Sequence, residues 1–143
     1  SEMCIRDSQM TARPLRKIAS GGEVSRVMLA CKVVLGESDV CDTLVFDEVD
    51  AGVGGATAVA LAEVLAQLAK THQVIVVTHL PQVAVMASKQ YVVSKTEEHN
   101  ALPITSLTEV SGTQREEEIA RMLSGSITEA SLAHAHELLS EVR

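Results

Sequence analysis

The chain has almost no aromatic side chains: Phe46 and Tyr91 are the only two among 143 residues, and tryptophan is absent. Stacking of nucleic-acid bases on aromatic rings is therefore not expected of this segment. Basic residues are also few, because 12 lysines and arginines oppose 19 aspartates and glutamates, which gives a formal net charge of -7. Since a phosphate-binding surface needs clustered Lys and Arg, any contact with DNA must be made elsewhere or by a small local patch.

Paired cysteines and long apolar runs are missing as well. Cys4, Cys31 and Cys41 are odd in number and have no paired spacing, which excludes a disulfide framework and a zinc site. This usage fits a reducing cytosol. No apolar run approaches the length of a transmembrane helix, and the first residues have no secretory pattern. We therefore expect a cytoplasmic protein with no membrane partner.

The apolar residues that are present predict an α/β fold. They make up 46% of the chain, enough for a core, and the length fits one domain. Residues 1–13 have no helical or strand period and are interpreted as a tail or a non-native scar, which leaves one lobe over residues 14–143. The pattern in that lobe predicts buried strands at 43–47 and 73–78, a strand pair at 90–95 and 104–110, and helices at 20–35, 56–70, 81–86, 114–123 and 127–142.

Two adjacent carboxylates, Asp47 and Glu48, follow the first buried strand directly. The order of strand, helix and strand implies parallel pairing with a right-handed crossover, and ligands bind outside the carboxyl ends of such strands. One carboxylate there can hold a hard cation and the other can take a proton from water. The alternative is a strand end with two solvated acids, and the pair alone gives both interpretations about equal weight.

Three further elements have a structural and a functional interpretation. Ser20 and Glu23 form an S-x-x-E capping box, which explains an ordinary helix start. The same helix start, with Gly21 and Gly22 beside it, can also hold a phosphate on its free N–H groups. His79 ends the second buried strand and is either a structural hydrogen-bonding residue or a phosphate contact at the same sheet edge.

The glycine-rich segment that begins at Asp50 is the third of these elements, and it reads DAGVGG. It is either a flexible connection from strand to helix or a loop that passes close to another backbone across an interface.

In this order the pieces resemble the C-terminal half of an ABC-type ATPase head, a P-loop NTPase fold with a mostly parallel sheet flanked by helices. SGGE resembles the signature motif, LVFDE the Walker B strand, VDAGVGG the D-loop and VVTH the switch histidine. Within that class the chain is similar to the RecN family of bacterial DNA-repair ATPases, relatives of the SMC proteins. KIASGGEVSRVMLACKVVL, QVIVVTHLPQVA and EEEIARMLSG also carry the resemblance, and Glu23 stands where transporter ATPases typically have Gln.

The resemblance implies ATP and Mg²⁺ as ligands and a role for each residue. Asp47 would coordinate Mg²⁺, Glu48 would be the general base and His79 would contact the γ-phosphate. Ser20, Gly21 and Gly22 would cap ATP bound on a partner head, Glu23 would buttress that cap, and Asp50 would cross the dimer interface. The resemblance also implies double-strand-break repair, recombination, head dimerisation, DNA contact through the full-length protein and a nucleoid-associated bacterial location.

One departure from the family pattern is the absence of a G-x-x-x-x-G-K-[ST] loop and of heptads for a coiled coil. Because that loop holds the β- and γ-phosphates, we expect a C-terminal lobe that is inactive until an N-terminal lobe completes it. Two alternatives stay open: a non-enzymatic dimerisation or regulatory module derived from such a head, and the ATPase lobe of a transporter.

Overall fold

The computed structural model describes residues 4–5, 13–14, 20–35, 41–96 and 104–142. The chain divides into two compact units, Ser1–Thr78 and His79–Arg143. This division at the end of the second buried strand was not expected from the sequence. The first unit also contains a two-residue antiparallel pair, β1 (Cys4–Ile5) with β2 (Arg13–Pro14), in the segment that was interpreted as a tail.

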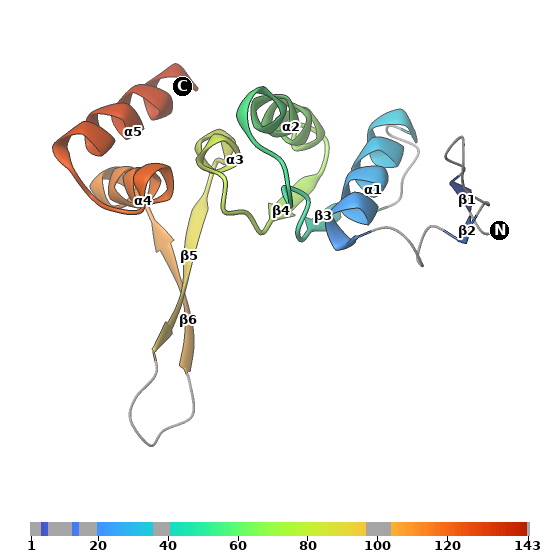
Figure 1. Cartoon of the computed structure of the whole chain (residues 1–143), viewed down its shortest axis with the longest axis horizontal. Coiled ribbons are helices and arrows are strands. Elements are labelled where there is room, and N and C mark those ends of the chain that lie inside the picture. Colours follow the sequence, from blue (N-terminus) through green and yellow to red (C-terminus); the bar gives the residue numbers. More distant parts are fainter. Residues whose placement is uncertain (1–3, 6–12, 15–19, 36–40, 97–103, 143) are drawn as a thin grey trace. The chain divides into compact units, whose positions relative to one another are not determined.

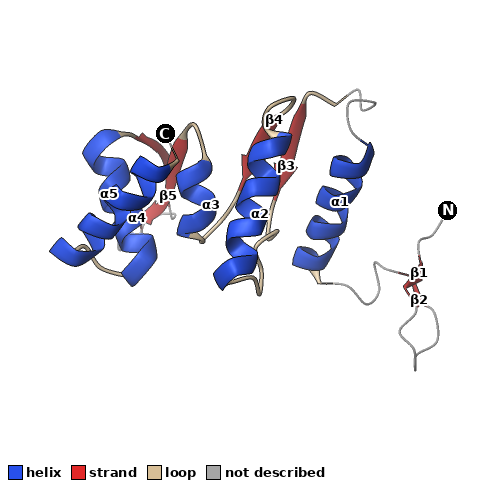
Figure 2. Ribbon diagram, turned by 90° about the horizontal axis from the view of Figure 1, so that it is seen from above, coloured by secondary structure: helices blue, strands red, loops and turns tan. Residues whose placement is uncertain are grey.

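The centre of the first unit is a parallel strand pair, as the order of elements predicted. Strand β3 (Thr43–Phe46) pairs with β4 (Gln73–Val76), and Val77 extends the ladder by donating its N–H to the carbonyl of Phe46 at 2.9 Å. Helix α2 (Gly55–Leu68) lies along one face of this pair (Figures 1 and 2). Alternate residues of β3 are buried, because only one face of the pair is covered within the described residues.

Helix α1 (Gly21–Leu35) begins with the predicted capping box. The backbone N–H of Ser20 donates to the Glu23 carboxylate at 2.8 Å, and the N–H of Glu23 donates to Ser20 Oγ at 3.3 Å. The apolar side chains at helical spacing on this helix are largely exposed: Val24 is 37%, Met28 51% and Val34 83% exposed, whereas Leu29 is buried. The described residues therefore do not cover this apolar face. Gly36, which directly follows the predicted end of this helix at residue 35, lies outside the described residues.

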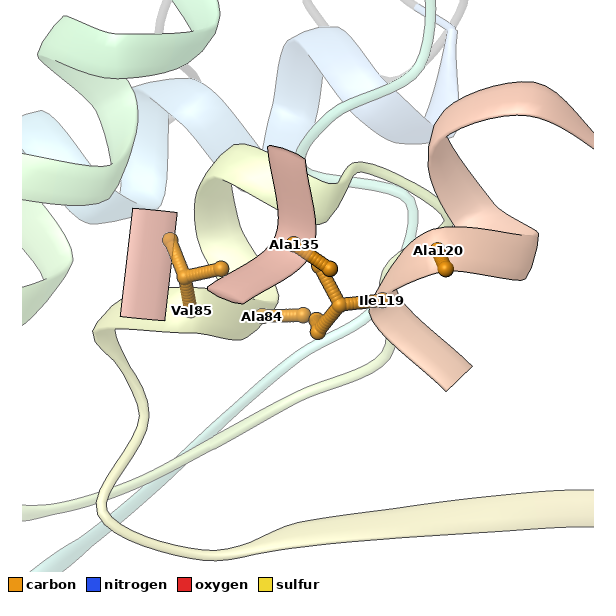
Figure 3. Close-up of a cluster of buried hydrophobic side chains, with 5 residues drawn as sticks. All are labelled: Ala84, Val85, Ile119, Ala120 and Ala135. Atoms are coloured by element: carbon orange, nitrogen blue, oxygen red, sulfur yellow. The ribbon is translucent and has the colours of Figure 1, made fainter. Parts of the chain in front are cut away.

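The second unit combines helix α3 (Pro81–Met86), strands β5 (Gln90–Thr96) and β6 (Ile104–Val110), and helices α4 (Gly112–Ser124) and α5 (Glu129–Glu141). The two strands form the predicted antiparallel pair. The three helices pack around Ile119, which has no exposed surface, and Figure 3 shows its neighbours in this core, which are Ala84, Val85, Ala120 and Ala135. Among the described residues no helix is long and apolar enough to span a bilayer.

The observed elements confirm the predicted α/β class, with the parallel pair β3–β4, the predicted antiparallel pair β5–β6 and two C-terminal helices, and they add the short antiparallel pair β1–β2. The predicted boundaries shift by one or two residues at several ends, which is usual because helix and strand ends are set by local hydrogen bonds that a periodic pattern does not resolve.

Candidate active site

The two predicted carboxylates lie directly after β3. Asp47 and Glu48 are both exposed, and the backbone of Glu48 has a φ of 56°. It is the one non-glycine residue with positive φ in the part of the chain that the structure describes. Such a conformation costs roughly 1–3 kcal/mol and is concentrated at functional sites, where surrounding contacts hold it. Glu48 is therefore held in a strained turn at the carboxyl end of a buried strand.

The first turn of α1 lies against this turn, and glycine makes the approach possible. A Cβ placed on Gly22 would be 2.6 Å from the carbonyl oxygen of Glu48 and 2.7 Å from the Cβ of Ala51. A Cβ on Gly21 would collide with the Glu48 carboxylate. The structure thus brings Gly21, Gly22 and Glu48 together in one chain. It also directs a carboxylate toward the helix N-terminus, where the free N–H groups and the positive dipole end lie.

Two side chains of α1, those of Ser25 and Arg26, hold the loop after β3. Neither residue was predicted to have a role in the site. Ser25 Oγ donates to the carbonyl of Asp47 at 2.7 Å. Arg26 Nη1 donates to the carbonyls of Val49 at 3.2 Å and Ala51 at 2.9 Å. The only sequence signal for these contacts is the position of Ser25 and Arg26 one turn after the Ser-Gly-Gly-Glu start.

Asp50 is buried, with 2% of its surface exposed. Its carboxylate accepts a short hydrogen bond from the hydroxyl of Thr78, two residues after β4. A buried carboxylate needs such partners, because desolvation of an unpaired charge is costly. The bond joins the loop after β3 to the end of the neighbouring strand. The expected role of Asp50 across a dimer interface stays a prediction.

His79 is exposed and is the first residue of the second unit. It follows Thr78 directly in the chain, so it continues from the strand end to which Asp50 is bonded. The predicted meeting of its side chain with Asp47 and Glu48 at one sheet edge stays a prediction.

The described residues contain no cluster of three or more His, Cys, Asp and Glu side chains that could hold a metal by themselves. Mg²⁺ usually keeps several waters and is bound through one or two carboxylates plus phosphate oxygens. Asp47 is an exposed carboxylate of that kind at the strand end.

Comparison with known proteins identifies the family. The chain is 54% identical over 127 residues to the DNA repair protein RecN of Deinococcus radiodurans, 50% over 133 residues to that of Streptomyces coelicolor and 53% over 135 residues to that of Mycobacterium leprae. These matches cover 89%, 92% and 94% of the chain. Over the matched residues, the chain belongs to the RecN family. No protein-family model matches it.

The chain spans between a fifth and a quarter of the length of these RecN proteins, 22%, 23% and 22% respectively. A solved structure from work on ATP-driven dimerization and DNA-stimulated activation of SMC ATPases matches the fold. It has a TM-score of 0.50 and 20% sequence identity, and the match covers 99% of this chain and 72% of the other. The RecN segment therefore shares the fold of this solved structure, as the sequence motifs predicted.

Proposed function

We propose that this RecN segment supplies the hydrolytic half of an ATP site in a DNA double-strand-break repair ATPase. In this proposal the missing P-loop and the rest of the sheet come from an N-terminal lobe of the same protein, and the segment alone is inactive. Two completed heads dimerise around ATP, and DNA is bound by other parts of the full-length protein. The location is the bacterial cytoplasm, at the nucleoid.

The single observation that carries the proposal is the position of Glu48. An exposed carboxylate at the carboxyl end of a buried parallel strand, held in left-handed backbone, suits a general base that accepts a proton from an attacking water. The residue adopts this backbone although it is not a glycine, and the contacts of α1 with the loop hold it there. Strain that is maintained by neighbouring contacts in this way supports a functional role rather than a structural one.

The proposal extends to the other residues of the site. Asp47, an exposed carboxylate at the end of β3, would hold the Mg²⁺ that accompanies ATP, and the ion would neutralise charge on the phosphates. Ser20, Gly21 and Gly22 offer a helix start to the γ-phosphate of ATP on a partner head. Glu23 buttresses that start, a role which its 2.8 Å bond from the Ser20 N–H supports.

His79 and Asp50 complete the proposed set. His79 contacts the γ-phosphate of the head to which it belongs. Asp50 holds the loop that meets the partner head, and its bond from Thr78 supports this, because a fixed loop can present the same surface to each partner.

The test is a chimera in which this chain replaces the matching segment of the Deinococcus radiodurans RecN. The chimera should hydrolyse ATP, and the isolated chain should not. Glu48→Gln in the chimera should lower kcat by about 10²–10⁴-fold, the usual contribution of a general base, while ATP binding is retained.

Lys70→Gln in the chimera is the control, because Lys70 is exposed in the turn two residues after α2. It should change neither kcat nor ATP binding. Full turnover in the Glu48→Gln chimera would overturn the assignment of the base. A stable dimer of the isolated chain that does not respond to an N-terminal lobe would instead favour the dimerisation module.

A further inference from the structure

We propose that Arg26 is a positioning residue that holds Glu48 and Asp50 in their working conformation. The proposal rests on the ATPase function above and adds a residue to it. Arg26 lies on α1, more than 20 positions before the loop that it contacts, and it is partly buried. Its guanidinium bonds the carbonyls on both sides of Asp50, those of Val49 and Ala51.

The loop depends on α1 for the partners of its backbone. Of five successive carbonyls, those of Glu48 and Asp50 are bonded within the loop, by the N–H groups of Ala51 and Val53 at 3.0 Å each. The carbonyl of Asp47 accepts from Ser25, and those of Val49 and Ala51 accept from Arg26. Two of those three bonds come from the single guanidinium. Without Arg26 the loop would lose most of the contacts that tie it to α1.

The consequence for catalysis follows from the strained turn. Glu48 is in left-handed backbone, which it would leave if the next residues were free to relax. The carbonyl of Glu48 closes a turn with Ala51, and Ala51 is one of the two residues that Arg26 holds. Arg26 therefore fixes the direction of the Glu48 carboxylate through the backbone, without any contact with nucleotide.

Arginine suits this task in a way that lysine does not. Both bonds come from one nitrogen, Nη1, whose two hydrogens are fixed in the plane of the guanidinium. The hydrogens of an ammonium rotate on a flexible stem, so a lysine would not hold the two carbonyls in one geometry. Arg26→Lys should therefore keep the charge and lose part of the positioning.

The test measures kcat, KM for ATP and the unfolding midpoint in the chimera described above. Arg26→Met should lower kcat about 10–100-fold, the cost expected when a catalytic group is misplaced by about 1 Å, with KM changed less than about threefold. Arg26→Lys should fall between Arg26→Met and the parent. Lys70→Gln, which also removes one positive charge, should match the parent.

A second variant keeps the test valid if Arg26→Met does not fold. Arg26→Ala leaves space for a free guanidinium ion, so low, non-denaturing guanidinium should restore part of kcat and ammonium should not. Retention of kcat within about threefold in Arg26→Met would overturn the proposal. So would an equal change in kcat and KM together with a lowered unfolding midpoint and no rescue, because that pattern marks a purely structural residue. If the parent chimera does not hydrolyse ATP, the proposed function itself has failed.

Discussion

Replacing Glu48 with glycine should give a more stable chain than replacing it with glutamine, and both variants should be inactive. Glu48 has a φ of 56°, and left-handed backbone costs a non-glycine residue roughly 1–2 kcal/mol. Glycine adopts this backbone without that cost, but it loses about 0.5–1 kcal/mol more than other residues in chain entropy on folding. Relative to Glu48→Gln, the free energy of unfolding should therefore be higher by about 0.5–1 kcal/mol.

The reference for this measurement is Glu48→Gln rather than the parent. Both substitutions remove the carboxylate beside the N-terminus of α1, an interaction worth about 0.3–1 kcal/mol at the surface. Only the glycine variant also relieves the backbone. The difference between the two variants therefore isolates the strain from the lost charge.

The assay is urea unfolding followed by far-UV circular dichroism. With a denaturant slope of about 1.5 kcal/mol/M, the midpoint of Glu48→Gly should lie about 0.3–0.7 M above that of Glu48→Gln. In the chimera both variants should lack ATP hydrolysis. A glycine variant no more stable than the glutamine variant would show that the turn stores no strain, and the argument from Glu48 to function would fail.

The remaining predictions concern packing and capping in each unit. Gly22→Ala should cost about 1–3 kcal/mol by overpacking, since its Cβ would be 2.6 Å from a backbone oxygen; an unchanged urea midpoint would refute the close approach. Ile119→Ala should cost about 2–5 kcal/mol, whereas the 62% exposed Ile104 should change stability by less than about 0.5 kcal/mol on the same substitution. Thr128→Ala removes the capping box of α5 and should lower α5 stability by about 1 kcal/mol, measured by hydrogen exchange.

Local patterns in the sequence predicted the elements and the order of the motifs. The capping box of Ser20 and Glu23 was readable because its partners are three residues apart and the residue types are specific to it. The parallel pairing of β3 with β4 was readable because both runs are apolar and a helix separates them.

The close contacts of the candidate site were not readable in this way. Arg26 reaches carbonyls 23 and 25 residues away, and a carbonyl acceptor leaves no trace in the residue type that carries it. The left-handed backbone of Glu48 was also hidden, because glycine or asparagine is the usual signal for that conformation. The sequence indicated that Gly21 and Gly22 allow a close approach to the start of α1. It did not indicate that Glu48 of the same chain lies against them.

The uncovered face of the β3–β4 pair governs how the isolated chain should behave at high concentration. Val45, Ile75 and Val77 are 66%, 47% and 57% exposed on it, and each of the two strands has one edge without a strand partner among the described residues. The segment Gln73–Thr78 has no charge, proline or glycine, which is the composition that favours intermolecular strand addition. Strand addition between copies at these edges should therefore limit the concentration at which the isolated segment stays in solution.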